Sequence, residues 1–258
     1  MNQQSIVALD KVSLNYHSLE GETPALKGIC MNVFKGEFIG IVGPSGCGKT
    51  TILSLIAGLM RPTSGQVFVE GREVDGPSSE VGYMLQQDHL FEWRTIRQNV
   101  LLGLEIQDKL NKESKEHTDH LLETYGLADF RNHYPQQLSG GMRQRVALIR
   151  TLAVNPEVLL LDEPFSALDY QTRLALSDEV ANIIRKEQKT ALLVTHDISE
   201  AISMSDRVLV LSKRPGTIKS NHLIQLSGEN RSPVELRKAP EFREYFNTIW
   251  KELDVHVS

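Results

Sequence analysis

"EFIGIVGPSGCGKTT" occupies residues 37–51 and decides what kind of fold this chain adopts. Its first half, Glu37–Gly43, is a short, dense apolar run, which is typical of a buried parallel strand. Its second half matches the pattern G-x-x-x-x-G-K-[ST] and leads into "KTTILSLIAGL", which predicts a helix. Glycines let backbone amides face phosphate oxygens, and the helix N-terminus adds partial positive charge. The stretch therefore predicts a loop that binds nucleotide phosphates, the alternative being a glycine-rich turn that merely joins strand to helix.

The residues expected to bind the nucleotide run through this motif. They are Gly43, Pro44, Ser45, Gly46, Cys47, Gly48, Lys49, Thr50 and Thr51. Lys49 is expected to reach the β- and γ-phosphates, and Thr50 to ligate Mg²⁺. Cys47 is either a tolerated small residue or, if the helix N-terminus lowers the pKa of its thiol, a thiol-reactive one.

Outward from this loop, the chain alternates strand and helix patterns. Further buried strands are predicted at residues 81–86, 157–162, 190–194 and 206–212. Alternation of this kind predicts an α/β fold with a mostly parallel sheet. The pattern from Ile96 to Ala153 is helical and polar, which predicts a helical insert. Residues 6–16 predict a strand, residues 64–74 a hairpin, and the tail one or two amphipathic helices.

Two acids follow the apolar run "VLLL", at Asp162 and Glu163. Acids at a strand end are common, but the carboxyl ends of parallel strands are also where nucleotide sites form. Asp162 is expected to hold Mg²⁺ through water, and Glu163 to accept a proton from the attacking water. Together with the phosphate loop, the pair predicts hydrolysis of a nucleoside triphosphate.

Composition narrows the class of protein. The 258 residues are 40% hydrophobic, with a formal net charge of −5, so a nucleic-acid partner is not expected. Two cysteines argue against a disulfide framework. Neither a signal-peptide pattern nor an apolar run of the roughly 20 residues that span a bilayer occurs. These features predict a soluble, cytoplasmic protein.

Six features occur in the order found in ATP-binding subunits of ABC transporters, which the chain resembles from about residue 6 to residue 225. They are Tyr16, "GPSGCGKT", Gln86, "LSGGMRQR" (138–145), "LLLDEPFSALD" (159–169) and "VTHD" (194–197). The resemblance implies a P-loop NTPase (RecA-like) core with an antiparallel β subdomain and an inserted α-helical subdomain. It implies a nucleotide-binding core with the β subdomain at 1–87 and 154–225, a helical subdomain at 88–153 and a helical tail at 226–258.

"LSGG" explains why one chain carries a second glycine-rich helix start. In this family, two chains pack head to tail around two ATP molecules. The resemblance implies that Ser139, Gly140 and Gly141 bind the γ-phosphate of the nucleotide on the partner chain, in a homodimer. It also implies that Asp169 crosses the dimer interface. The alternative for Ser139 is an ordinary helix N-cap.

Three more site residues follow from the resemblance. Tyr16 resembles the aromatic residue that stacks on adenine, although a strand tyrosine alone is more often a core residue. Gln86 resembles the glutamine that contacts Mg²⁺ or the lytic water, and the adjacent Gln87 leaves the register open by one. His196 resembles the histidine that senses the γ-phosphate, whereas a lone histidine after a strand is otherwise structural.

The segment "LFEW", residues 90–93, resembles the "LFPW" of ATPases from importers of the nitrate, sulfonate and taurine type, with Glu92 in place of proline. This resemblance implies a permease partner, an indirect solute-binding protein and a position on the inner face of the membrane. Leu90, Phe91 and Trp93 would then form the docking surface, unless they anchor the insert to its own core. The rival hypotheses are an ABC-type ATPase without a permease and a small-molecule kinase. The tail either packs on the core or regulates it.

Overall fold

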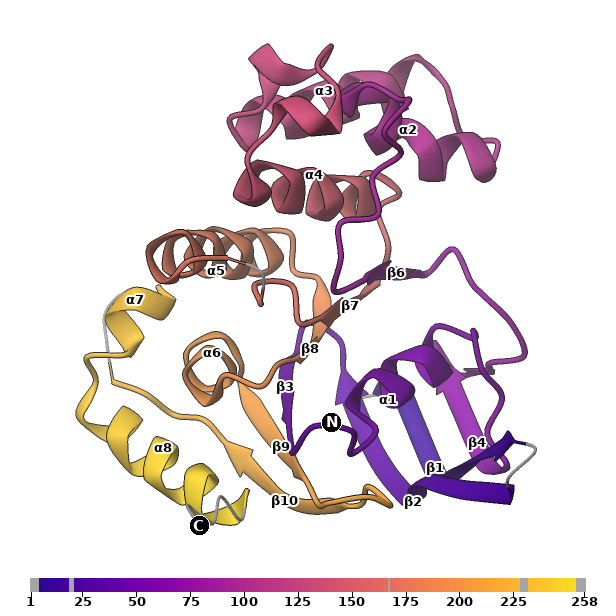
Figure 1. Ribbon diagram of the computed structural model, residues 1–258, viewed down its shortest axis with the longest axis vertical. Coiled ribbons are helices and arrows are strands. Elements are labelled where there is room, and N and C mark those ends of the chain that lie inside the picture. The colour runs from indigo at the N-terminus through magenta and orange to yellow at the C-terminus, as the bar shows by residue number, and fades with distance from the viewer. Residues whose placement is uncertain (1–4, 19–20, 167, 228–231, 254–258) are drawn as a thin grey trace. The chain divides into compact units, whose positions relative to one another are not determined.

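The computed structural model describes residues 5–18, 21–166, 168–227 and 232–253 (Figure 1). These residues form two compact units. The first unit comprises residues 1–78 and 177–258, and the second comprises residues 79–176. Each unit is described by itself.

An antiparallel sheet in the first unit is built on one long strand. This strand, β1 (Ser5–Ser18), pairs with β2 (Gly21–Phe34) on one side and with β4 (Ser64–Val69) on the other. A short strand, β5 (Arg72–Glu73), completes the predicted hairpin with β4. The pairing of β1 with β2 shifts register at four places, so the apolar residues of these strands alternate irregularly.

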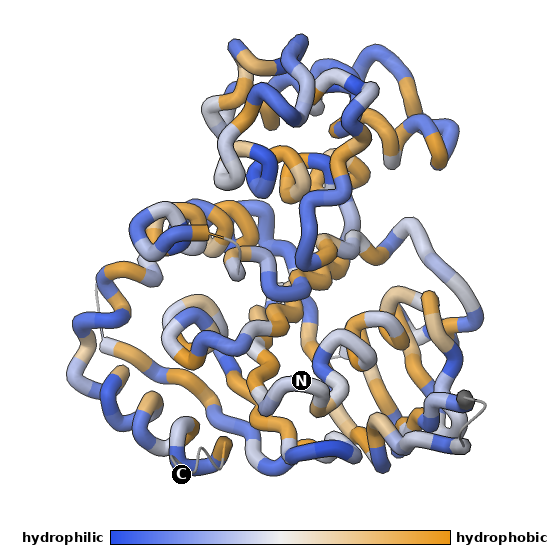
Figure 2. Tube along the Cα trace, in the orientation of Figure 1, coloured by the Kyte–Doolittle hydropathy of each residue, from blue (hydrophilic) through white to orange (hydrophobic). Residues whose placement is uncertain are grey.

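The strand before the phosphate loop, β3 (Phe38–Val42), lies between two parallel neighbours, β8 (Thr190–Val194) and β9 (Arg207–Leu211). At the far edge, β10 (Ile218–Leu223) pairs antiparallel with β9. Every residue of β3 and β8 is buried. Strands buried on both faces are expected to be continuously apolar, and Figure 2 shows these strands largely in the hydrophobic colour.

Helices cover the strands of this unit. One of them, α1 (Lys49–Ile56), contacts β4 and β8, and α6 (Ile198–Met204) contacts β3 and β9. The tail forms α7 (Pro233–Leu236) and α8 (Pro240–Glu252), both of which pack on α6. At the end of α8, Glu252 accepts hydrogen bonds from Ser220 and His222 of β10. The tail is thus held to the unit by apolar packing and by this polar cluster.

The second unit contains a parallel pair of strands, β6 (Val81–Met84) and β7 (Val158–Asp162). Three helices pack together beside these strands: α2 (Ile96–Ile106), α3 (Lys112–Thr124) and α4 (Gly140–Ala153). Two 3₁₀ turns, η1 (Ala128–Phe130) and η2 (Pro135–Gln137), connect α3 to α4. Capping boxes at Thr95 and Asn111 begin α2 and α3. The long helix α5 (Tyr170–Lys186) starts in this unit and ends in the first.

A bidentate ion pair ties two helices of the second unit together. Arg97 of α2 donates to both carboxylate oxygens of Asp119 on α3, at 2.6 and 2.8 Å. The guanidinium hydrogen bonds and charge hold the pKa of Asp119 below its ordinary value despite partial desolvation.

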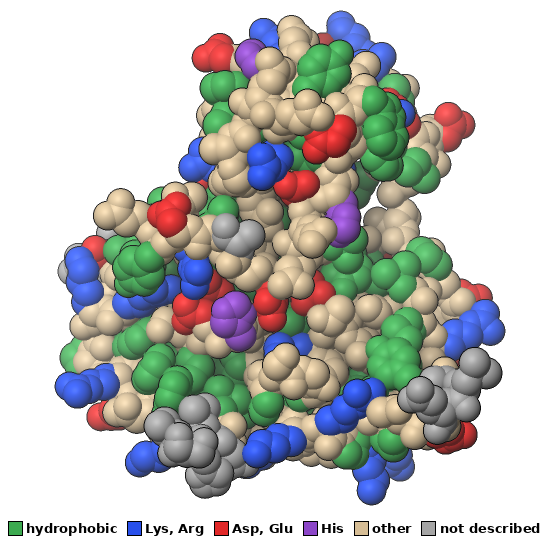
Figure 3. Space-filling view, viewed as in Figure 1, with side chains coloured by type: hydrophobic (Ala, Val, Ile, Leu, Met, Phe, Trp, Pro, Cys, Tyr) green, Lys and Arg blue, Asp and Glu red, His purple; other side chains and the backbone are tan. Residues whose placement is uncertain are grey.

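Among the described residues, none of the helices has the length and apolar character that crossing a membrane requires. On the face seen in Figure 3, acidic and basic side chains are interspersed rather than gathered by sign.

Candidate functional site

The phosphate loop connects β3 to α1, as the sequence predicts, and its glycines are there for different reasons. Gly48 has φ +103°, and a Cβ atom on it would lie 2.5 Å from Leu26 Cδ2. A Cβ on Gly43 would lie 2.7 Å from Cys47 Sγ. Gly46 has open space around it but φ +74°, which side chains disfavour. No side chain caps the N-terminus of α1. The loop therefore brings backbone amides together at an uncapped helix start, which suits an anion.

Lys49 is the first residue of α1 and is only 7% exposed. Its Nζ donates to the carbonyl oxygens of Gly43 and Pro44, at 2.8 and 3.2 Å. The ammonium group thus lies against the carbonyl groups of the phosphate loop, beside the predicted position of the nucleotide phosphates. A phosphate oxygen in the same loop would offer it a charged acceptor, which binds an ammonium more strongly than a neutral carbonyl does.

Cys47 is 1% exposed inside this loop. Burial raises the pKa of its thiol, and the nearby Lys49 only partly opposes this. Of the two interpretations of Cys47, burial therefore favours the tolerated small residue over the thiol-reactive one.

Tyr16 lies on β1 and is 39% exposed, so it is not a core residue. Its hydroxyl forms a hydrogen bond with Thr51 Oγ1 at 2.9 Å, which links β1 to α1, the helix that follows the phosphate loop. Its ring also lies near the guanidinium of Arg214, which the sequence pattern did not single out.

His196 is exposed and lies two residues after the end of β8. Both of its neighbours have fixed positions. Thr195 donates to Glu200 at 2.6 Å, and Asp197 caps α6 by accepting from the amides of Ser199 and Glu200. The exposed imidazole therefore stands on a rigid turn between a strand and a helix.

Asp162 and Glu163 lie at the end of β7 in the second unit. Asp162 is 5% exposed and accepts a hydrogen bond from Tyr83 on β6 at 3.2 Å. Glu163 has φ +45°, a strained conformation for a residue with a side chain. Gln86 Nε2 donates to the Glu163 carboxylate at 3.1 Å. Glu163, the predicted base, thus contacts Gln86, the glutamine predicted to contact Mg²⁺ or the lytic water. This contact favours Gln86 over Gln87.

The "LSGG" segment starts α4, and Ser139 is the N-cap residue, accepting from the Met142 amide at 3.3 Å. The two glycines differ. A Cβ on Gly141 would lie 2.9 Å from Thr172 Cγ2, whereas a Cβ on Gly140 would have only one neighbour within 4 Å, Arg143 Nη2 at 3.9 Å. Packing within the chain thus gives no reason for glycine at position 140.

Asp169 is exposed just before α5. Its carboxylate accepts from the Thr172 amide at 3.1 Å, and hydrogen bonds from Thr172 lower its pKa. It therefore caps the start of α5, the helix that follows it.

The predicted magnesium ligands Thr50, Gln86 and Asp162 offer a hydroxyl, an amide and a carboxylate. Hard oxygen donors of this kind suit Mg²⁺, which takes a few protein ligands and completes its shell with water and phosphate. Among the described residues, no group of three or more histidine, cysteine, aspartate and glutamate side chains could hold a metal alone.

Comparison with known proteins identifies the family. The model of the family "ABC transporter" matches residues 26–166. The chain belongs to the ABC transporter family. It is 52% identical to the uncharacterized ABC transporter ATP-binding protein YtlC of Bacillus subtilis, over 97% of this chain and 96% of that protein. It is 45% identical to the nitrate import ATP-binding protein NrtD of Synechocystis, over 89% and 88%.

A solved structure confirms the fold and the enzyme class. The dimeric, post-hydrolysis structure of the ATP-binding cassette MJ0796 bound to ADP and Pi matches 85% of this chain and 99% of its own, with a TM-score of 0.74 and 32% identity. This ABC protein is therefore an α/β P-loop ATPase of the cassette type, as predicted.

In this ABC ATPase, the residues of the "LFEW" segment have different environments. Leu90 is 7% exposed and belongs to the core of the insert, whereas Trp93 is 74% exposed and stacks on Phe91, with ring centroids 4.8 Å apart. The anchoring interpretation thus holds for Leu90, and Trp93 is a surface residue.

A buried residue that the sequence analysis missed supports this aromatic pair. Asn99 is 0% exposed. Its amide group donates to the carbonyls of Phe91, Arg94 and Thr95 and accepts from the Phe91 amide. An asparagine within a helix pattern gave no sign of this role, which depends on the loop folding back onto α2.

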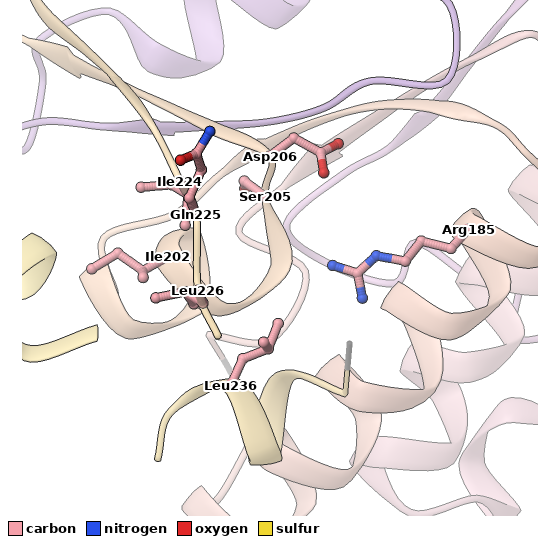
Figure 4. Close-up of a pocket in the computed structure, with 8 residues that line it drawn as sticks. All are labelled: Arg185, Ile202, Ser205, Asp206, Ile224, Gln225, Leu226 and Leu236. Atoms are coloured by element: carbon pink, nitrogen blue, oxygen red, sulfur yellow. The ribbon is translucent and has the colours of Figure 1, made fainter. Parts of the chain in front are cut away.

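A cavity of about 190 Å³ in the first unit contains none of the predicted site residues (Figure 4). Its apolar wall includes Ile202, Leu226 and Leu236. On its polar side, Arg185 donates to the Met204 carbonyl and Asp206 accepts from the Phe38 amide. These polar groups hold backbone segments of the first unit in place.

Proposed function

We propose that this ABC ATPase is the ATP-binding subunit of an importer and that ATP binding drives two copies together. The phosphate loop and Tyr16 would bind one nucleotide, with Asp162 and Glu163 of the same chain acting on it. Ser139, Gly140 and Gly141 would bind the γ-phosphate of the nucleotide on the second copy. Because ATP would bind the closed pair more tightly than the separate chains, it would shift the population towards closure.

One observation supports this proposal most strongly. Gly140, the first residue of α4, has no neighbour that would prevent a side chain, and glycine is a weaker helix former than alanine. The glycine therefore costs stability without improving the packing of its own chain. Close approach of a ligand to the backbone is a reason for such a glycine. A reciprocal pairing with two-fold symmetry would complete both sites at once.

The residues of each chain would divide the chemistry. Lys49 and the loop amides would bind the phosphates, and Asp169 would contact the partner chain across the interface. Thr50, Gln86 and Asp162 would hold Mg²⁺, which neutralises charge on the transferring phosphoryl group. Glu163 would take the proton from the attacking water, positioned by its hydrogen bond with Gln86, and His196 would contact the γ-phosphate.

The helical unit would receive the permease. Trp93 is exposed and stacks on the partly buried Phe91, and exposed apolar patches often mark interfaces. Beside them in sequence, Glu92 borders a hollow of about 570 Å³ that His133 and Tyr134 also line. A side chain or helix turn of a membrane subunit could occupy such a hollow.

The transported solute would be a small anion of the nitrate, sulfonate or taurine type. This rests on the likeness of "LFEW" to that subfamily and on the nitrate import relative. A separate solute-binding protein would select it outside the membrane. The ATPase would then lie on the inner face of the membrane, held there by its permease.

The test is Glu163→Gln, which removes the base but keeps the shape of the side chain. Turnover should fall about 10²–10⁴-fold, while ATP binding persists. The variant should therefore elute as a dimer from a sizing column with Mg²⁺-ATP and as a monomer with ADP. A monomeric variant that still hydrolyses ATP rapidly would contradict both the base assignment and ATP-driven pairing.

A further inference from the structure

We propose that Arg214 is a positioning residue for the nucleotide base. It would hold the ring of Tyr16 in the orientation in which the other face of the ring receives adenine. This inference rests on the proposed role of Tyr16 and extends it to a second residue, far away in sequence.

The guanidinium of Arg214 lies over the ring of Tyr16. The guanidinium carbon of Arg214 lies 5.9 Å from the centroid of the Tyr16 ring, within the range of a cation–π interaction. Tyr16 is fixed at its other end, where its hydroxyl bonds Thr51 Oγ1 and lies 3.8 Å from Met60 Sδ. With the hydroxyl held and one face covered, the ring has little freedom to turn.

Arg214 is itself held by a hydrogen bond to β2. Its Nε donates to the carbonyl oxygen of Pro24 at 3.0 Å. Pro24 pairs with Asn15, the residue before Tyr16, in the ladder of β1 and β2. The arginine thus reaches the strand pair that carries Tyr16, and its guanidinium is fixed by a hydrogen bond as well as by the ring.

The loop that carries Arg214 comprises residues 212–217, between β9 and β10. Gly216 donates to Ala25 at 2.8 Å and accepts from Lys27 at 3.0 Å, so the loop is bonded to β2 on both sides of Leu26. A Cβ on Gly216 would lie 2.1 Å from the carbonyl oxygen of Cys47, in the phosphate loop. The same six residues therefore contact the phosphate loop at one end and the base-stacking tyrosine at the other.

The chemical consequence is specific to the base. A preorganised ring costs less entropy when a base stacks on it. The phosphates do not touch the ring, so Arg214 should affect ligands that carry adenine and should not affect ligands that carry phosphates alone.

The experiment measures binding of ATP and of inorganic tripolyphosphate to the full chain by calorimetry. Arg214→Ala should weaken ATP binding about two- to five-fold, as expected for a cation–π contact at an exposed site, and leave tripolyphosphate binding unchanged. In steady-state assays KM for ATP should rise with kcat unchanged. Arg214→Gln, which keeps a donor for Pro24 but loses the charge, is the second variant should the alanine variant not fold. Lys213→Ala removes an adjacent exposed cation and is the matched control, with no effect expected.

A double-mutant cycle with Tyr16→Ala separates the possible failures. If Arg214 acts through Tyr16, then Arg214→Ala should have no further effect once Tyr16 is gone. If Tyr16→Ala weakens ATP binding but Arg214→Ala leaves it unchanged or strengthens it, Arg214 is neutral or occupies the place of the base, and the inference is wrong. If Tyr16→Ala has no effect, the proposed role of Tyr16 fails, and with it the basis of the inference.

Discussion

Two segments of this chain place glycines at the start of a helix, and they are built in opposite ways. In the phosphate loop, Gly43 and Gly48 are crowded by their own chain, and no side chain caps α1. In the "LSGG" segment, residues 138–141 and below called the signature segment, Ser139 caps α4, and Gly140 has open space beside it. The first segment is thus shaped by contacts inside its unit. The second is capped by its own serine and leaves space beside Gly140, as expected for a segment that another molecule approaches.

Lys49→Ala should have the largest effect on the first of these segments. The ammonium group would make charge-assisted hydrogen bonds to phosphate, worth about 1.5–3 kcal/mol each, so ATP binding should weaken at least about ten-fold in a calorimetric titration. Unchanged affinity would mean that Lys49 serves only the carbonyls of Gly43 and Pro44.

Mixing two variants tests whether the phosphate loop of one chain and the "LSGG" segment of another act on the same nucleotide. A Lys49→Ala chain has a defective phosphate loop and an intact signature, and a Ser139→Ala chain has the reverse. If the two segments act in trans, the mixture forms pairs with one intact site and regains ATPase activity. The control mixture, Lys49→Ala with Glu163→Gln, should stay inactive, because both residues would act on the nucleotide of their own chain.

Gly140→Ala should have an intermediate effect, confined to activity. Alanine is the better helix former and has space here, so Tm should stay unchanged or rise slightly. Turnover should fall about ten-fold if the partner's phosphate approaches this backbone closely. Full activity together with unchanged stability would argue against a ligand at position 140.

The matched control is Gly82→Ala in the same unit. There a Cβ would lie 2.8 Å from both Thr151 Cγ2 and Pro156 Cγ, so the cost is overpacking of about 1–3 kcal/mol. Thermal unfolding should therefore separate the two glycines, with Tm lowered only for Gly82→Ala.

Local patterns predicted the parts of the fold that depend on short sequences. The buried strands β3, β7, β8 and β9 are continuous apolar runs, and the phosphate motif fixes the turn into α1. Two strands, β2 and β10, had no such signal. The residues of β2 follow no clean alternation because its register with β1 shifts, and β10 is an edge strand with no fully buried residue.

The site divides in the same way. Sequence motifs predicted which residues bind the nucleotide, but not the contacts that folding gives them. Arg214, Tyr83 and Asn99 contact residues distant in sequence or in a folded-back loop, at Tyr16, Asp162 and Phe91. The sequence left two interpretations of Cys47 open, because the motif shows the helix start and not the burial around it.

Trp93→Ala should have the smallest effect on the chain itself. Trp93 is 74% exposed, and its removal deletes one stacking contact with Phe91. Exposed substitutions usually change stability by no more than about 0.5 kcal/mol, so Tm and the ATPase rate of the isolated chain should stay the same. Retention on the permease in detergent should weaken at least about five-fold, because exposed tryptophans at interfaces often contribute much of the binding energy.

Trp250→Ala on α8 removes a second exposed tryptophan that stacks on Phe246 and should leave retention unchanged. Equal losses for both variants would mean that the aromatic pair at Phe91 and Trp93 is not a specific docking surface, and a fall in Tm for Trp93→Ala alone would restore the interpretation that it anchors the insert.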